Sequence, residues 1–207
     1  MRYNLYLAGF ILIPLFFFFY LILQVVHVDK ENIKQEGTIA DFISKSAGAR
    51  SDREDAFMLE QYPAIFSRSY SGLNRVIAPN LRALIYEPAP ANSIPDIYYE
   101  HPVLKSRTDR QVDFYIPKQD KEKLSIKDYK IPYIYLKFKN EPHSSTGYYL
   151  DVYLYAYKTY WGVALTFASL LLSILCCIGA AGAYQHNKFF LAYTAFIVVL
   201  HFLILIF

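Results

Sequence analysis

Charge is distributed along this chain of 207 residues in a way that leaves both ends almost uncharged. All eighteen acidic residues lie between Asp29 and Asp151, and beyond residues 29–158 the only Lys or Arg residues are Arg2 and Lys188. The net charge of +3 conceals this division, because an ordinary water-soluble domain has a similar average. The distribution predicts a membrane protein with apolar ends and a polar middle.

Three runs without Asp, Glu, Lys or Arg set the number of expected membrane spans. They cover Leu5–Val26, Trp161–Tyr184 and Phe189–Phe207, which are 22, 24 and 19 residues long. At about 1.5 Å per residue, a helix of about 20 residues crosses the hydrocarbon core of a bilayer. We therefore expect three transmembrane helices.

These spans divide the chain into five expected segments. The first is a transmembrane anchor helix at 1–27, which an extramembrane domain follows at 28–158. A second transmembrane helix at 159–184, a short cytoplasmic hairpin at 185–188 and a third transmembrane helix at 189–207 complete the chain. The expected fold class is a membrane protein of the α+β type, with a small, mostly antiparallel β-rich domain inserted between helices 1 and 2.

The first apolar run also resembles a cleaved signal peptide, because Arg2 precedes it. Signal peptides have an apolar region of about 7 to 15 residues and then small residues at the cleavage site. Here the run is longer and continues through Gln24–Val28, which lacks such a site. An uncleaved anchor is therefore the favoured interpretation.

Orientation is predicted from the cations in the short segments. Arg2 and Lys188 fall on the same side of a three-span topology, and cationic short segments stay in the cytoplasm. This places the N-terminus in the cytoplasm, and the domain and the C-terminus outside, in a bacterial plasma (inner) membrane. The opposing signal is three lysines that flank the membrane on the domain side: Lys30, Lys34 and Lys158.

The polar middle has the pattern of a folded domain of about 130 residues, which is enough for one hydrophobic core. Short runs alternate apolar with polar residues, as half-buried strands do; in one of them Val112, Phe114 and Ile116 would face the core. Helical spacing is expected around Gly72–Tyr86 and a single short turn at Asp120–Leu124. The expected strands are 37–43, 56–62, 64–70, 111–117 and 131–139.

Small residues recur at three- and four-residue spacing along the second span and so form one helical stripe. Close packing of helices in lipid favours such residues, although a stripe of this kind can also line a pathway for an ion or a substrate. We favour packing against the first or third span. The stripe consists of Thr166, Ser169, Ser173, Cys177 and Ala180.

Polar side chains also occur within the other two spans, near their expected outer ends. Gln24 and His27 lie on one face of the first helix, and His201 lies six residues from the end of the third. An ionisable residue at this depth is a functional hypothesis by default. The competing interpretation, which we favour, is that His201 is neutral and bonds to Thr194, Gln24 or a backbone carbonyl.

Tyrosines are concentrated before the second span. Tyr149 and Tyr153 belong to this concentration, and Tyr98 and Tyr99 could contribute to the same surface. An aromatic belt at the membrane interface explains the concentration most simply. The functional alternative is a surface that binds a partner, because tyrosine supplies contact area at low entropic cost.

Common catalytic and cofactor motifs are not found in the sequence. It has no His-Glu-x-x-His, no glycine-rich phosphate loop, no Gly-x-Ser-x-Gly and no Cys-x-x-Cys. Acidic residues interrupt the lysine-rich stretch around residues 118–130, which argues against binding of nucleic acid. We expect no cofactor, no metal and no enzymatic activity.

The order of elements resembles that of small uncharacterised bacterial membrane proteins with an extracytoplasmic β-rich domain between transmembrane helices. The resemblance rests on the anchor helix, the segments Gly37–Ala40, Leu59–Phe66 and Val112–Leu124, and a returning membrane helix. These motifs are structural, so the resemblance implies an architecture and no activity. The third span and the proline-rich segment at 87–95 depart from that pattern.

Two classes of function follow from these patterns. The favoured one is a non-enzymatic membrane protein whose outer domain binds a protein partner, as an accessory subunit of an envelope complex or as an immunity-type protein, or forms a homo-oligomer. The alternative is a membrane enzyme or transporter component that uses Gln24, His27 and His201.

Overall fold

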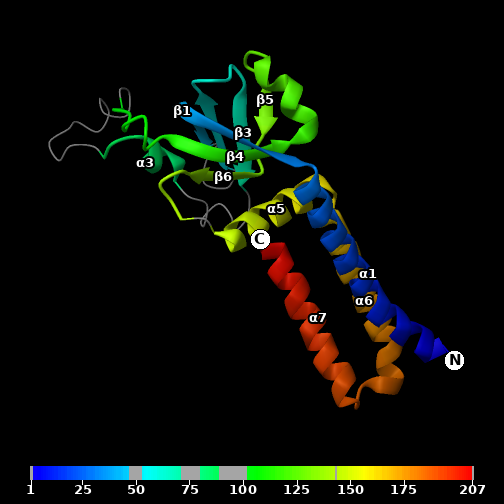
Figure 1. Cartoon of the computed structure of the whole chain (residues 1–207). Helices are drawn as coiled ribbons and strands as arrows, with labels where there is room; N and C mark the ends of the chain where they lie inside the picture. The colour runs from blue at the N-terminus through cyan, green and yellow to red at the C-terminus, as the bar shows by residue number, and fades with distance from the viewer. Residues whose placement is uncertain (1, 47–52, 71–79, 89–101, 143, 207) are drawn as a thin grey trace. The chain divides into compact units, whose positions relative to one another are not determined.

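The chain forms two compact units in a computed structural model that describes all residues except 1, 47–52, 71–79, 89–101, 143 and 207. Residues 1–30 and 152–207 make up one unit, which we call the helical unit. Residues 31–151 make up the other, which we call the β unit. Figure 1 labels the elements of both units, and each unit is described below by itself.

The helical unit is built mainly from three long apolar helices. These are α1 (Arg2–Lys30), α6 (Gly162–Tyr184) and α7 (Lys188–Ile206). Helices α1 and α6 are each long and apolar enough to cross a membrane, whereas α7 is apolar but shorter. Pro14 lies inside α1 and is buried there, and the helix continues on both sides of it.

Among the residues that the structure describes, six strands of the β unit form one sheet in the order β5-β3-β2-β1-β4-β6. The fold is therefore α+β. Four of the neighbouring pairs are antiparallel and the pair β3 with β5 is parallel, so the sheet is mixed. The strands are β1 (Asn32–Ser46), β2 (Arg53–Leu59), β3 (Ile65–Tyr70), β4 (Gln111–Pro117), β5 (Lys130–Pro132) and β6 (Tyr135–Phe138).

Strand β1 holds the two halves of the sheet together. Its residues 32–38 pair with β4, and residues 39–46 pair with β2. The register shifts between Ile39 and Asp41, where the strand passes from one partner to the other. Such an irregularity bends a strand and increases its twist, so one long strand can serve two partners.

The core of the β unit lies on one face of this sheet. Val112, Phe114 and Ile116 of β4 have no solvent-exposed surface, while Asp113 and Tyr115 between them are partly exposed. This alternation confirms the face predicted from the sequence. Aromatic rings fill the centre of the core, with Phe57 stacked on Phe66 at 5.4 Å between ring centroids.

The described residues of the β unit also form shorter helices. They are α3 (Leu81–Ile85), the 3-10 helix η1 (Lys118–Ser125) and the first half of α5 (Ser145–Thr159), whose residues from Val152 onward belong to the helical unit. The expected turn at 120–124 is confirmed by η1. The helix expected at 72–86 is present in its described part as α3, and residues 71–79 lie outside the described chain.

The single strand expected at 131–139 was wrong. The chain forms β5 and then β6 instead, because Tyr133 and Ile134 leave the ladder and are buried. Helix α5 was not singled out from the sequence either. Its tyrosines hide the helical pattern, because they occur both on its buried and on its exposed sides.

Candidate functional site

Several polar side chains are buried inside the helical unit, among apolar ones such as Phe10 and Phe17. Thr166, Ser169 and Ser173 of α6 are each less than 5% exposed, and Ala180 on the same stripe has no exposed surface. Cys177, the remaining member of the stripe, is partly buried. The predicted stripe thus faces the other helices of its unit.

His201 is the deepest ionisable side chain of the helical unit and has no exposed surface. Its Nδ1 lies 2.8 Å from the carbonyl oxygen of Ile197, and its Nε2 lies 3.0 Å from the hydroxyl of Ser169. A carbonyl oxygen only accepts, so Nδ1 carries the hydrogen, and Nε2 of a neutral ring accepts from Ser169. Phe17 stacks on the ring at 6.0 Å between centroids.

Gln24 and His27 do not join His201 through hydrogen bonds, because both of its ring nitrogens already have partners. The ring of His27 packs edge-on against Tyr160 at 5.9 Å, and Gln24 is partly buried on the same helix. The structure therefore places a packed histidine, and not a chain of polar groups, inside the unit.

Helices α1 and α6 approach each other closely because a glycine on each helix faces a side chain of the other. A Cβ atom on Gly179 would come within 2.6 Å of the ring of Tyr6, and one on Gly9 would come within 2.9 Å of Cys176 Sγ. These contacts run antiparallel along the two helices. Small residues at such contacts are typical of helices that associate in lipid.

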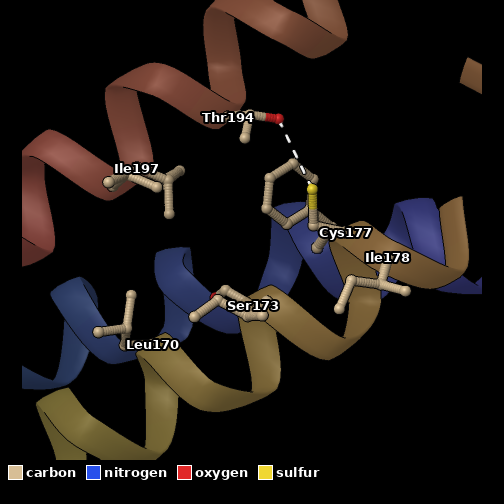
Figure 2. A pocket seen from close by; sticks show the side chains of 9 residues that line it. Leu170, Ser173, Cys177, Ile178, Thr194 and Ile197 are labelled. Carbon is tan, nitrogen blue, oxygen red and sulfur yellow. Dashed lines mark hydrogen bonds between the residues drawn. The ribbon is translucent and has the colours of Figure 1, made fainter. Parts of the chain in front are cut away.

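Helix α7 contacts the stripe at Ser169 and at Cys177. Between α6 and α7 lies a groove of about 100 Å³ that Ser173, Cys177 and Thr194 line together with apolar residues (Figure 2). Cys177 Sγ lies 3.8 Å from Thr194 Oγ1, and that hydroxyl donates to the carbonyl of Phe190 at 2.8 Å. The hydroxyl of Ser173 is buried and has no hydrogen-bond partner among the described residues.

The outer surface of the helical unit is apolar. Phe16 and Ile178 are each 69% exposed, and Phe202 is 62% exposed. Trp161 begins α6 in the left-handed backbone conformation with φ of 63°, which is uncommon for a residue with a Cβ atom, and its indole is exposed. Other exposed apolar residues on these helices are Leu5, Leu15, Phe19, Ile22, Phe167, Leu171, Leu175, Phe189, Leu191, Phe196 and Val199.

A cluster of charged and phenolic side chains is buried in the β unit. Asp55 has no exposed surface and accepts two hydrogen bonds from Arg53, at 2.8 and 2.5 Å. Burial raises the pKa of the Asp55 carboxyl, and the bonds from Arg53 oppose that shift. Arg68 donates to Asp151 of α5 at 2.6 Å and to the carbonyl of Ile134 at 2.7 Å.

Two tyrosines complete this cluster. The hydroxyl groups of Tyr70 and Tyr133 lie 3.1 Å apart, and the guanidinium of Arg68 lies 5.1 Å from the ring centroid of Tyr70. Burial raises the pKa of Tyr133 well above its usual value and raises that of Tyr70 as well. Each charge has an opposite partner, so the cluster joins β2, β3 and the start of α5.

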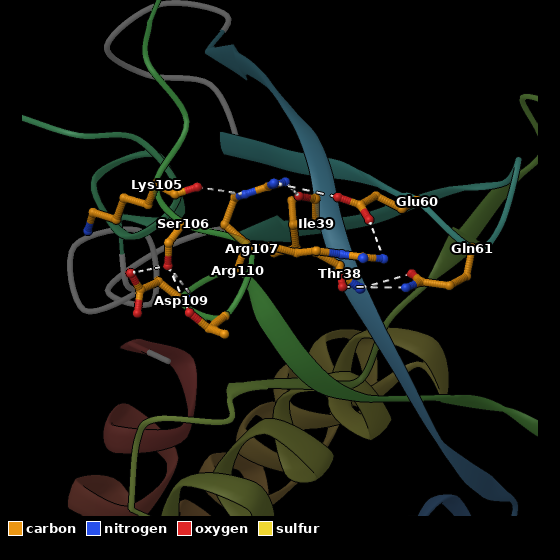
Figure 3. A network of polar contacts seen from close by, with 10 residues as sticks. Thr38, Ile39, Glu60, Gln61, Lys105, Ser106, Arg107, Asp109 and Arg110 are labelled. Carbon is orange, nitrogen blue, oxygen red and sulfur yellow. Dashed lines mark hydrogen bonds and ion pairs between the residues drawn. The ribbon is translucent and has the colours of Figure 1, made fainter.

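A second polar network supports the loop before β4 (Figure 3). Arg110 donates to the carbonyl oxygens of Ile39 and of Lys105, and its other nitrogen lies 3.5 Å from Glu60. Arg107 also pairs with Glu60, at 3.0 Å. Two of these contacts go to backbone carbonyls and two to Glu60, so the network fixes the loop to β1 and to the residue that follows β2.

The tyrosine surface expected from the sequence is described only in part, because Tyr98 and Tyr99 lie outside the described residues. Tyr149 is 55% exposed and packs on Tyr148 at 5.2 Å. Tyr148 in turn contacts two rings of the sheet, those of Tyr115 and Tyr135. Tyr149 therefore projects from a rigid base within the β unit.

Tyr153 belongs to the helical unit, where it is partly buried and stacks on Tyr157 at 5.8 Å. Its burial makes it a packing residue more than a docking residue. Of the four tyrosines singled out from the sequence, only Tyr149 is described as an exposed side chain.

Among the described residues, no group of three or more His, Cys, Asp or Glu side chains is placed to hold a metal ion. Comparison with known proteins adds no assignment: no protein-family model, no curated protein and no solved structure matches the chain.

Sequence reasoning missed the cluster around Arg68. Arg53, Arg68 and Tyr70 lie on neighbouring strands, and the spacing of these arginines and this tyrosine was a signal for the cluster.

Proposed function

We propose that this chain is an integral membrane protein with three spanning helices, whose β unit lies outside the cytoplasm and binds a protein partner. The observation that carries the membrane placement is the apolar outer surface of the helical unit. Phe16 and Ile178 are each 69% exposed, whereas Ser169 and His201 are buried among the helices. Water penalises an apolar exterior of this kind and lipid favours it.

A core helix of a water-soluble protein explains these helices less well. Only 22% of the residues in the most apolar part of α1 are buried, and the value for α6 is the same. A core helix would bury most of its length. A signal peptide explains α1 less well too, because Tyr6 and Gly9 of α1 are in close contact with α6.

Partner binding is supported by Tyr149. The exposed ring rests on Tyr148, which the sheet tyrosines hold in place, so little side-chain entropy would be lost on binding. Exposed tyrosines on a rigid base are typical of residues that dominate binding energy at interfaces. Leu150 beside it is 41% exposed and adds apolar area.

The proposed location is a bacterial plasma membrane, with the N-terminus and residues 185–188 in the cytoplasm. Arg2 and Lys188 support this orientation, because the contact between Asn4 and Tyr184 brings the start of α1 and the end of α6 to the same end of the helical unit. Cationic short segments favour the cytoplasmic side.

The experiment combines extraction and purification of the full chain. Membranes are washed with alkaline carbonate, and the chain is then purified in mild detergent together with whatever remains bound at fixed stoichiometry. We expect the chain to resist the wash, and a stoichiometric partner to dissociate in Tyr149→Ala but not in Ile126→Ala, which alters an exposed apolar residue elsewhere on the β unit.

The second candidate function is enzymatic or transport chemistry that uses Gln24, His27 and His201. It is favoured by the burial of the ionisable ring of His201 in the helical unit. The occupied nitrogens of His201 argue against it. If the chain purifies alone and His201→Ala abolishes a cellular phenotype at unchanged expression, partner binding is wrong and this second candidate replaces it.

A further inference from the structure

One end of the helical unit brings together three chain segments that are far apart in sequence. The hydroxyl of Tyr184 donates to Asn4 Oδ1 at 2.7 Å, and a Cβ atom on Gly182 would meet the ring of Tyr3 at 3.2 Å. The start of α1, the end of α6 and the start of α7 therefore lie at this end. Arg2 and Lys188 are both exposed here.

The helical unit cannot neutralise these two cations by itself. Residues 1–28 and 152–207 contain no aspartate or glutamate. The one acidic residue of the unit is Asp29, near the opposite end of α1 and about 40 Å from Arg2 along the helix. An anion that pairs with Arg2 or Lys188 must come from outside the unit.

An apolar groove opens at the same end of the helical unit as the two cations. It has a volume of about 410 Å³ and is lined by Leu7 and Ile11 of α1 and by Tyr184, Phe189, Phe190 and Tyr193. Asn187 also lines it, so Lys188 lies between two groove residues. Arg2 precedes Leu7 by five residues, which is about 7.5 Å along the helix.

The groove and the cations together match one kind of molecule, an amphiphile with an anionic head and an alkyl chain. The lining side chains are aromatic and aliphatic, and Tyr184 and Tyr193 carry the hydroxyl groups expected at a membrane interface. Tyr193 donates to the carbonyl of Ile11 at 3.2 Å, which holds one wall of the groove against the other. A volume of this size is typical of sites for small ligands.

We propose that this groove binds one anionic glycerophospholipid of the surrounding bilayer. Lys188 and Arg2 hold its phosphate, and an acyl chain lies along Leu7, Ile11 and Phe190. The site rests on the proposed membrane placement of the helical unit. It would select lipids by charge and would attach the α6–α7 hairpin to the anionic leaflet.

Native mass spectrometry of the full chain, released from mixed micelles, tests the site. The probes are phosphatidylglycerol and phosphatidylcholine with identical acyl chains. We expect one phosphatidylglycerol to remain bound in preference to phosphatidylcholine. Loss of one cation, in Lys188→Gln, is expected to weaken that preference about fivefold.

Two variants control the experiment. Lys158→Gln removes one cation beside the start of α6 and should leave the preference unchanged, whereas Ile11→Trp fills the groove and should reduce binding of both lipids. Equal retention of the two lipids by the wild-type chain overturns the proposal, as does a preference that survives Lys188→Gln and Arg2→Gln together. Alkaline carbonate extraction, read separately, shows whether the membrane placement itself has failed.

Discussion

The two units of this chain differ in the side chains that they expose. In the β unit, Phe57 and Phe114 are fully buried, and charged residues such as Lys34 of β1 are exposed. In the helical unit, large apolar residues such as Phe16 and Ile178 are exposed. Both units bury apolar side chains, so the difference lies in their surfaces, and on our proposal water surrounds one unit and lipid the other.

The largest expected difference between the units comes from the same substitution made in each. Phe114→Ala in the β core should lower the free energy of unfolding of the β unit by about 3–5 kcal/mol, because it leaves a cavity. Phe16→Ala should change stability by less than about 0.5 kcal/mol, because that ring lies on the outer face. Urea unfolding in detergent, followed by proteolysis of the unfolded unit, measures both. Equal losses would contradict the exposure of Phe16 on the outer surface of the helical unit.

The next largest difference is expected from a lysine placed on the exposed surface of each unit. Leu171→Lys on α6 should oppose membrane insertion by about 2.5–3.5 kcal/mol, because a cation near the centre of a span must leave water. Ile126→Lys on the β unit should be tolerated, since that side chain is already half exposed. The fraction of chain inserted into membranes during translation measures the difference. Equal insertion of the two variants would place α6 in water.

Alkaline pH should destabilise the β unit through its two buried tyrosines. Burial raises the pKa of Tyr133 and of Tyr70 in the folded chain, so the unfolded state loses these protons first. The stability they contribute is complete below the unfolded value of about 10 and is lost as pH rises above it. Unfolding midpoints measured across that range should fall.

The double variant Tyr70→Phe/Tyr133→Phe is the control for this pH effect. It removes both hydroxyl groups at once, so stability near neutral pH should change little, and the loss at alkaline pH should become smaller. An unchanged alkaline loss would assign the effect to other groups.

The smallest expected effect is the difference in stability between alanine substitutions at two serines of the α6 stripe. Ser169→Ala removes the partner of His201 Nε2 and should cost about 0.6 kcal/mol, with an upper value of about 1.7 kcal/mol. Ser173→Ala should cost nothing or should stabilise, because that hydroxyl is buried without a partner among the described residues. Thermal unfolding of the helical unit in detergent compares them. A larger loss for Ser173→Ala would reveal a ligand or partner at its groove.

The sequence was most informative where one physical rule acted alone. The lengths of the runs without charged residues predicted the extents of α1 and α6 to within a few residues. The alternation of apolar and polar residues predicted the buried face of β4. The division of the 131–139 run was not predictable, because Tyr133 and Ile134 satisfy a strand pattern and are buried only through contacts with distant strands.

Interactions between side chains far apart in sequence account for the rest of what sequence reasoning missed. The partner of His201 was expected among Thr194, Gln24 or a carbonyl; a carbonyl was found, and Ser169 was the further partner. The pairing of Arg68 with Asp151 joins residues 83 positions apart, a distance over which no local pattern operates. The apolar groove proposed to bind an anionic lipid likewise depends on how α1 and α7 meet.

Labelling of single cysteines tests the central claim that the two units face different solvents. In a chain with Cys176 and Cys177 replaced by alanine, one spin label is placed at Ile178 and another at Val103, which is 56% exposed on the β unit. In lipid vesicles, we expect the Ile178 label to be accessible to dissolved oxygen and shielded from a water-soluble relaxing agent. The Val103 label should be accessible to that agent. Access of the agent to both labels would contradict the claim.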